Sequence, residues 1–499
     1  MSNSKPNAIQ IKPRRSIAID ALTLAVFFLL SLWMTRPLVC EIFDSVAGRI
    51  GDNIYFVWLV GWFKKAYFSL GADPMQVWFL NYPAGWNLAS TEIAPAQLAL
   101  AVPFALLGGE TFGYNVALLL SFALSGWFVY LWISSWTGSR CAGWIAGLIF
   151  ACLPYRQAHF LAGHLNLAGT QWLPLFFWGW IALLHRDEND TRVHVRAAIM
   201  VALGLGLTAL CSQYYIFMTL FIGAILFLGA LCWNRRLLTS APFWKSLLVM
   251  GLVALPLLVI AEAPFLMLDA SGAMPNRDIS SVRQYSASIS DFLLPATTHF
   301  LFGGRVRALF NRDLWIESSL YLGYIALTLF FIGYFLRRSA GGNRMIWRFL
   351  VLGVLSSVIL AMGTDLHWNE RAVELALPRF LADRLGRETF PLLLPGYFLF
   401  KYFPFFAKIR AMMRFGIFSG LLLAAGAGIG TAALITRIKA AKKSALPLFL
   451  ALSILILLEY APRALPETAV IAPRPADRYL AAQPDDGAVM RLPFYLNDD

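Results

Sequence analysis

The residues of this sequence best suited to chemistry are carboxylates that follow its first long apolar run. The segment CEIFDSVAGRIGDNIYFVWLVGWF, which begins at Cys40, places Asp44 and Asp52 just beyond that run. Each carboxylate has an ordinary explanation as part of a solvated loop. Asp52 is the stronger candidate because it lies between Gly51 and Asn53 and leads straight into an aromatic stretch. A carboxylate held at headgroup depth could meet a lipid-linked substrate, and partial desolvation there would raise its pKa.

A second polar stretch, LPYRQAHFLAGHLNLAGTQWLPL at 153–175, carries Arg156, His159 and His164. The two histidines are five residues apart, which is not the i, i+4 spacing of a zinc-binding helix, and no glutamate is close by. A metal pair is therefore disfavoured. Two alternatives stay open, namely ordinary interfacial histidines or hydrogen bonding to a sugar or a phosphate. His164 is the preferred ligand residue because Gly163 leaves room beside it.

Three charged residues further along the chain complete the candidates. Glu317 begins the run ESSLYLGYIAL, and a carboxylate at the mouth of a span is costly unless it is paired or faces a wet cavity. Arg410 and Arg414 are four residues apart and would project from one helical face. Two guanidinium groups suit a phosphate or a pyrophosphate, because each fork matches a pair of phosphate oxygens. The alternative is that both arginines only snorkel to ordinary lipid phosphates.

The elements that must position these residues are membrane helices. Of the 499 residues 59% are hydrophobic and 14% are charged, and the mean hydropathy is +0.64. Apolar runs of about the length that crosses a bilayer recur along the chain, so we predict an all-α polytopic bundle of about 11–13 transmembrane helices. The predicted spans are 17–39, 112–135, 141–154, 169–185, 197–212, 213–232, 246–267, 319–336, 349–362, 414–436 and 445–460. Three more stretches, 54–72, 92–108 and 391–406, could span, re-enter or lie in the interface.

The basic residues predict the orientation of this bundle. The net charge of +13 comes from Lys and Arg in short loops between apolar runs. Basic residues in such loops set the topology of a membrane protein, and here they do not form a nucleic-acid surface. Residues 1–16 are then a cytoplasmic N-terminus, and 17–460 form the bundle, with a retained first span. The outer loops are about 40–91, 155–168, 268–318 and 363–413. Residues 461–499 form an extracytoplasmic segment, which either packs on the bundle or belongs to a longer protein.

Two stretches have a predicted local structure. In 54–65, Tyr55, Trp58 and Trp62 would share one helical face ahead of two lysines, which is typical of an interfacial helix. In 474–494 we expect a short helix, a turn at 484–487 and a strand from Ala488. The five cysteines have no paired spacing that would indicate a disulfide framework or a zinc site.

The order of motifs resembles a known group. GDNIYFVWLVGWF, NYPAGWNLA, LPYRQAHFLAGHLNLAGTQWLPL, WIESSLYLGY and PGYFLFKYFPFFAKIRAMMRFGIF together resemble bacterial multi-span proteins of the type C glycosyltransferase (GT-C) superfamily, over nearly the whole chain. The resemblance implies an enzyme of the bacterial cytoplasmic membrane. It would move a sugar from a polyprenyl-phosphate donor to a glycan or lipid acceptor on the outer face, in contact with membrane lipids and without nucleic acid.

The resemblance also implies roles for particular residues. An acidic residue in the first outer loop of that superfamily is the catalytic base or positions the acceptor, and the match is Asp52, with Asp44 second. Arg410 and Arg414 would neutralise the departing phosphate, and His164 would orient the sugar or the acceptor. The other expected substrate-binding residues are His159, Arg156 and Glu317.

The loop also departs from the superfamily pattern. Many relatives carry adjacent acids or an acid-x-acid pair in the first outer loop, whereas Asn53 and Ile54 follow Asp52 here. A divalent metal therefore stays open as a cofactor, with no ligand motif to assign. The alternative function is a non-catalytic transporter or scaffold that handles lipid-linked sugars with the same bundle.

Overall fold

The computed structural model describes residues 16–185, 191–272, 276–310, 316–337, 344–464 and 466–484. Of the segment predicted after the last span, the short helix is present as α22 (Pro475–Ala481). The predicted turn lies outside the described residues beyond Pro484, and so does the strand predicted from Ala488.

The prediction of an all-α polytopic chain is confirmed. Every predicted span overlaps an observed helix, and the described residues include seven helical segments that are long and apolar enough to cross a membrane. They are α1 (Ile17–Met34), α5 (Glu110–Thr137), Leu165–Leu184, α11 (Gln213–Trp233), α12 (Ala241–Ala270), α17 (Arg344–Ala361) and Met412–Ala440. Five apolar helices are shorter, namely α4 (Pro95–Gly108), α6 (Arg140–Ala151), α10 (Val195–Ala209), α16 (Tyr324–Leu336) and α21 (Leu446–Glu459).

The stretches with open assignments differ from one another. Residues 54–72 contain α3 (Asp52–Lys65) followed by the π-helical turn η1 (Ala66–Leu70). Trp62 is buried in α3, so the three aromatic residues do not share one exposed face; Tyr55 and Trp58 are half-buried. Residues 391–406 contain α19 (Pro395–Tyr402), which at about 1.5 Å per residue is too short to span a bilayer.

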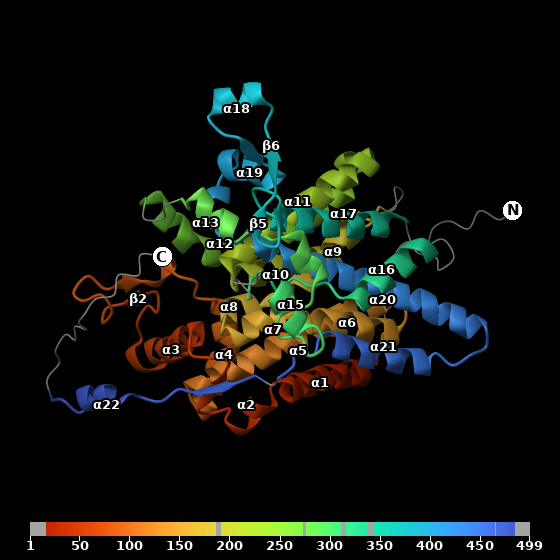
Figure 1. Ribbon diagram of the computed structural model, residues 1–499. Coiled ribbons are helices and arrows are strands. Elements are labelled where there is room, and N and C mark those ends of the chain that lie inside the picture. The colour runs from red at the N-terminus through yellow and green to blue at the C-terminus, as the bar shows by residue number, and fades with distance from the viewer. Residues whose placement is uncertain are drawn as a thin grey trace.

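Small residues let the long helices pack closely. A Cβ added to Gly147 of α6 would lie 2.4 Å from the carbonyl oxygen of Gly126 in α5, and one on Gly430 of α20 (Gly416–Ala440) would lie 1.9 Å from that of Leu329 in α16. Backbone contact of this kind takes the place of the hydrophobic driving force that lipid removes. The elements α3, β2 and α22 lie at one end of the bundle, and the loop between α20 and α21 lies at the opposite end (Figure 1). The orientation of these ends in a membrane stays a prediction.

The connecting segments contain short elements. The remaining helices and helical turns are α2 (Arg36–Cys40), η2 (Leu88–Ser90), α7 (Pro154–Leu161), α8 (Leu165–Ala168), η3 (Thr170–Trp172), α9 (Leu173–Leu184), η4 (Arg235–Thr239), α13 (Ile279–Gln284), α14 (Ile289–Leu293), α15 (Gly303–Leu309), α18 (Arg379–Leu385), η5 (Phe406–Lys408) and η6 (Met412–Phe415). Within the described part of the chain the strands form four antiparallel pairs, β1 (Ser45–Ala47) with β8 (Thr468–Val470), β2 (Gln76–Val77) with β3 (Trp86–Asn87), β4 (His367–Trp368) with β5 (Arg371–Ala372), and β6 (Glu374–Ala376) with β7 (Thr389–Pro391).

The β1–β8 pair joins the first predicted outer loop to the segment after the last span. Val46 pairs with Ala469 at its centre, and the ladder continues beyond both ends. The amide of Gly48 donates to the carbonyl of Glu467 at 2.7 Å, and that of Ile471 donates to the carbonyl of Asp44 at 2.8 Å. Of the two explanations for the tail, packing on the bundle therefore applies to these residues.

Two hydrophobic cores meet at α7. The larger core contains α5, α6, α9, α17 and α20, and Tyr155 belongs to it. The smaller core lies around α3, α4 and the start of α5, and Phe160 belongs to it. The polar side chains of α7 and of the turn that follows it therefore lie at the junction between two rigid packed units.

Candidate active site

Asp52 is the first residue of α3, and the side chain of Asn53 stabilises the turn that precedes it. The Asn53 side chain is fully buried, its amide donates to the carbonyl of Arg49 at 2.8 Å, and its oxygen accepts from the amide of Gly51 at 2.9 Å. These two hydrogen bonds close the turn before the helix. Asp52 is thereby held at a fixed place while its side chain stays 66% exposed.

Two glycines allow the turn after α7 to approach this loop. Gly163 has φ +77°, and a Cβ there would lie 2.5 Å from the Cβ of Asn53. Gly48 has φ +82°, and a Cβ there would lie 1.9 Å from the carbonyl oxygen of Leu161. Both positions require glycine, because the backbone is in the left-handed conformation and an added Cβ would clash with the facing loop. The contact brings His164 to Asp52.

A row of polar side chains runs inward from Asp52. Its Oδ2 lies 3.1 Å from Nε2 of His164, and Nδ1 of His164 lies 2.7 Å from Nδ1 of His159. Nε2 of His159 lies 3.6 Å from Oε2 of Glu317. The row therefore starts at an exposed carboxylate and ends at a buried one.

Glu317 is balanced by Arg414. Nη2 and Nε of Arg414 donate to Oε1 of Glu317 at 2.6 and 3.0 Å, and the guanidinium stacks on Tyr214 with 4.3 Å between its carbon and the ring centroid. Both side chains are buried. A charge-assisted contact of this kind is strong inside a protein, and it meets the requirement that a carboxylate at this position be paired.

The pKa values follow from these contacts. The hydrogen bond from His164 lowers the pKa of Asp52 more than its partial burial raises it. The expected rise in the pKa of Asp52 is therefore wrong, because the sequence did not show the histidine donor. Burial lowers the pKa of His159 to about 4, although Glu317 opposes the shift. Burial raises the pKa of Glu317, but Arg414 and His159 together hold it well below its usual value.

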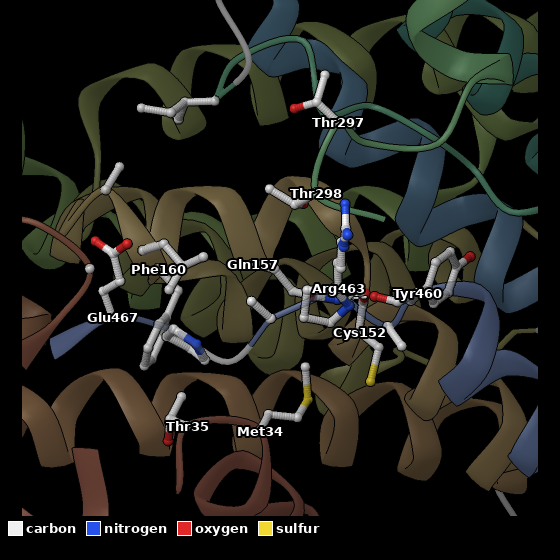
Figure 2. Close-up of a pocket in the computed structure, with 18 of the residues that line it drawn as sticks. Met34, Thr35, Cys152, Gln157, Phe160, Thr297, Thr298, Tyr460, Arg463 and Glu467 are labelled. Carbon is white, nitrogen blue, oxygen red and sulfur yellow. Dashed lines mark hydrogen bonds between the residues drawn. The ribbon is translucent and has the colours of Figure 1, made fainter. Parts of the chain in front are cut away.

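Asp52 and His164 face a cavity of about 1250 Å³. One wall is apolar and includes Met34, Phe160 and Leu457. In Figure 2 the segment that carries Arg463 and Glu467 passes between Thr297 and Thr298 on one side and Met34 and Thr35 on the other. This segment is anchored there by its backbone, since the amide of Arg463 donates to the carbonyl of Thr298 at 2.7 Å.

Four arginines line the same cavity. They are Arg36 after α1, Arg49 in the Asp52 loop, Arg307 in α15 and Arg463 after α21. Of the described carboxylates, Asp52 and Glu467 also line it, and Arg49 pairs with Glu467 at 3.4 Å on the exposed rim. Among the described residues, the lining thus has more guanidinium groups than carboxylates.

Some predicted site residues lie elsewhere. Arg410 and Arg414 do not share a helical face, because residues 409–411 separate η5 from η6; Arg410 stacks on Tyr285 with its guanidinium carbon 4.5 Å from the ring centroid. Arg156 is buried between two phenylalanine rings and donates to the backbone carbonyls of residues 151 and 121. Arg156 therefore supports the fold and does not face the cavity. Asp44 is exposed but does not line the cavity.

The cavity arginines and the role of Asn53 were not predicted from the sequence. Arg36 lies near the end of the predicted span 17–39, and Arg463 comes shortly after the predicted span 445–460, which is a local signal for a charge at headgroup depth. Arg49 and Arg307 had no such signal, since only the meeting of separate loops brings them to one cavity. Asn53 was treated as a departure from an acidic pair, whereas it closes the turn that holds Asp52.

The residues do not fit a bound metal ion. Among the residues that the structure describes, no group of three or more His, Cys, Asp and Glu side chains is placed to hold one. Within the row, Arg414 occupies the oxygens of Glu317, and the Nδ1 atoms of the two histidines face each other.

Fold and site define a polytopic α-helical membrane protein with a polar site at one end of its bundle. Residues 23–388 match a family described as a domain of unknown function (DUF6311), and the chain belongs to that family. A comparison with curated protein sequences finds no match.

Solved structures with a similar arrangement are transferases by their titles. Arabinofuranosyltransferase AftD from Mycobacteria aligns at 13% identity and a TM-score of 0.49, over 90% of this chain and 26% of that protein. The apo oligosaccharyltransferase of Archaeoglobus fulgidus aligns at 14% identity and a TM-score of 0.47, over 90% of this chain and 55% of that one. The oligosaccharyltransferase AglB from the same organism, in complex with an inhibitory peptide and a dolichol-phosphate, aligns at 14% identity and a TM-score of 0.40. The alignment covers 89% of this chain and 54% of that one. This chain thus spans about a quarter to about half of their lengths.

Proposed function

We propose that this protein is a glycosyltransferase of the GT-C type in the bacterial cytoplasmic membrane. It transfers a sugar from a polyprenyl-phosphate donor to a hydroxyl of a glycan or lipid acceptor on the outer face. The observation that carries the proposal is the exposed carboxylate of Asp52, fixed by His164 at the wall of a large cavity that also carries arginines. The motif resemblance to the GT-C superfamily supports it.

Asp52 is the base, and His164 is not. Both ring nitrogens of His164 are already engaged, Nε2 by Asp52 and Nδ1 by His159. His164 has no nitrogen left for an acceptor hydroxyl. Asp52 uses only Oδ2 in its contact with His164, so Oδ1 is its basic atom available to the cavity.

The lowered pKa of Asp52 suits a late proton transfer. Asp52 is ionised at neutral pH and is ready to accept a proton, although it is a weak base. As the acceptor oxygen bonds to the anomeric carbon it gains positive charge, and its proton becomes acidic enough for a carboxylate to take. The bond from the anomeric carbon to the phosphate oxygen breaks with inversion, its electron pair leaves with the phosphate, and the hydroxyl proton goes to Asp52.

The cavity arginines would hold the donor phosphate. Arg36, Arg307 and Arg463 line the cavity with Asp52, and guanidinium groups bind phosphate oxygens in pairs. The positive charge of these guanidinium groups stabilises the leaving phosphate further as its bond to the sugar breaks, because negative charge builds up on the phosphate. The role first expected of Arg410 and Arg414 therefore passes to these residues.

The apolar wall would hold the start of the prenyl chain. Trp33 and Met34 come from the end of α1 and Leu457 from α21, and both helices belong to the predicted membrane part. Only 17% of the residues of α1 are buried in this structure, as expected for a helix that faces lipid. A donor could then enter from the side with its chain in lipid and its phosphate among the arginines.

The proposal is tested by Asp52→Asn in purified protein with a polyprenyl-phosphate sugar. The change keeps the size of the side chain and removes its basicity, so transfer should fall by about 10²- to 10⁴-fold while the donor still binds. Asp44→Asn is the matched control, because Asp44 lies on the same loop outside the cavity. Near-full transfer by Asp52→Asn would remove Asp52 from the mechanism. Equal, modest effects of the two variants would favour the transporter or scaffold.

A further inference from the structure

We propose that His159 is a positioning residue, which fixes the tautomer of His164 so that His164 presents a proton to Asp52. This inference rests on the proposed function, because it assigns Asp52 as the group being positioned. His159 does not line the cavity and its side chain is fully buried, so it has no route to a substrate of its own. It acts through the 2.7 Å contact between the two Nδ1 atoms.

The distances restrict where the protons lie. A carboxylate can only accept, so Nε2 of His164 carries the hydrogen that spans its 3.1 Å contact to Asp52. A neutral His164 then has a bare Nδ1, which must accept. The only way to satisfy the 2.7 Å contact is for Nδ1 of His159 to carry the donated hydrogen. The hydrogen bonds therefore run in one direction, from His159 through His164 to Asp52.

The surroundings of Nε2 of His159 are consistent with hydrogen bonds that run from His159 to Asp52. With its hydrogen on Nδ1, neutral His159 has a bare Nε2, and this atom makes no hydrogen bond; it lies 3.6 Å from Glu317. A bare nitrogen beside a carboxylate is tolerated here because Arg414 already holds Glu317 in two hydrogen bonds. The lowered pKa of His159, due first to burial, supports the neutral form.

The surroundings keep His159 from turning away. Tyr155 packs edge-on against its ring with 4.2 Å between centroids, and Glu317 and His164 occupy the two nitrogen edges. The backbone adds a second tie, since the amide of His164 donates to the carbonyl of His159 at 3.1 Å. If His159 is lost, His164 can take its other tautomer, whose bare Nε2 would face the carboxylate of Asp52 and release it.

Three variants of His159 separate tautomer control from simple packing. His159→Asn places an amide where Nδ1 was and can still donate to His164. His159→Gln places its amide where Nε2 was, and His159→Leu keeps bulk without any polar atom. Nitrogen-15 spectra of the histidine rings in substrate-free protein report which ring nitrogen carries hydrogen, and His164→Gln assigns the signals.

The proposal expects a protonated Nε2 and a bare Nδ1 on His164 in the native protein and in His159→Asn, at a pH where both rings are neutral. In His159→Leu and His159→Gln, His164 should show a mixture of tautomers, and transfer should fall by at least about tenfold in kcat with little change in KM for the donor. His159→Asn should keep most of the activity. A native His164 with its hydrogen on Nδ1 would overturn the proposal, as would a folded His159→Asn as inactive as His159→Leu. The spectra need no substrate, so they decide this question even if Asp52→Asn refutes the proposed transferase.

Discussion

Gly163 and Asn53 touch across two loops that are far apart in sequence. A Cβ on Gly163 would lie 2.5 Å from both the backbone nitrogen and the Cβ of Asn53, and the backbone of Gly163 has φ +77°. Its carbonyl also accepts a hydrogen bond from Tyr114 at 3.2 Å. This contact brings together Asp52 and His164, which are the sequence neighbours of Asn53 and Gly163.

Gly163→Ala should separate Asp52 from His164. An alanine at this φ costs about 1–2 kcal/mol, and the clash with Asn53 adds to that cost because backbone atoms must move. We expect a lower unfolding temperature in detergent. We also expect that transfer activity falls by more than the decrease in the fraction of folded protein explains. Gly71→Ala is the matched control, since Gly71 has φ +58° and nothing within 4 Å of an added Cβ. Equal activity of the two variants would show that the close approach does not matter.

Removing the cavity arginines should weaken the binding of a lipid phosphate. Arg307→Ala and Arg463→Ala should each cost about 1.5–3 kcal/mol of binding free energy for a polyprenyl phosphate in detergent, because each removes a charge-assisted contact. Arg305→Ala is the control, as Arg305 lies on the same helix and does not line the cavity. Competition by inorganic phosphate would distinguish a headgroup site from one that needs the lipid. Unchanged binding in both cavity variants would contradict the assignment.

Breaking the ion pair between Glu317 and Arg414 should destabilise the fold strongly. Arg414→Met leaves a buried carboxylate without its cation, which typically costs about 3–5 kcal/mol. The double variant Glu317→Gln with Arg414→Met should recover much of that loss, since no charge is then left unpaired. Arg410→Ala is the contrast, because it loses only a stacking contact with Tyr285, worth about 0.5–1 kcal/mol. Unfolding by denaturant in detergent measures all of these. A similar loss for Arg410→Ala and Arg414→Met would be evidence against this pairing.

Stability should fall as the pH is lowered from about 6.5 to about 4. The pKa of His159 is about 4 in the folded protein, against 6.5 for an ordinary histidine, so in this interval the unfolded chain binds a proton that the folded protein does not. Unfolding is therefore favoured as the pH falls, and above pH 6.5 the residue has no effect. His159→Asn should flatten this part of the curve of unfolding temperature against pH. An unchanged slope would mean that His159 is not buried as a neutral ring.

The apolar runs alone were enough to predict the membrane helices. A lipid environment requires a long hydrophobic segment wherever the chain crosses the membrane. Each span can therefore be recognised from its own segment of the sequence. The carboxylate of Asp52, at the start of an aromatic helix, was also visible locally. Asn166 was visible as a polar residue of the stretch at 153–175 that carries the two histidines. The hydrogen bond that its amide donates to Glu92 at 3.1 Å was not visible, because the two residues are 74 positions apart.

The pairing of charges was decided by tertiary structure. Arg414 and Glu317 are separated by 97 residues, and their spacing from Arg410 and from the next span gave no sign that they bond to each other. The spacing of Arg410 and Arg414 suggested one helical face, but Arg410 lies in the non-helical residues between η5 and η6. The two side chains therefore contact different partners. Hydrophobicity is a property of each residue in its segment, whereas a hydrogen bond depends on two atoms that only the packed fold brings within about 3 Å.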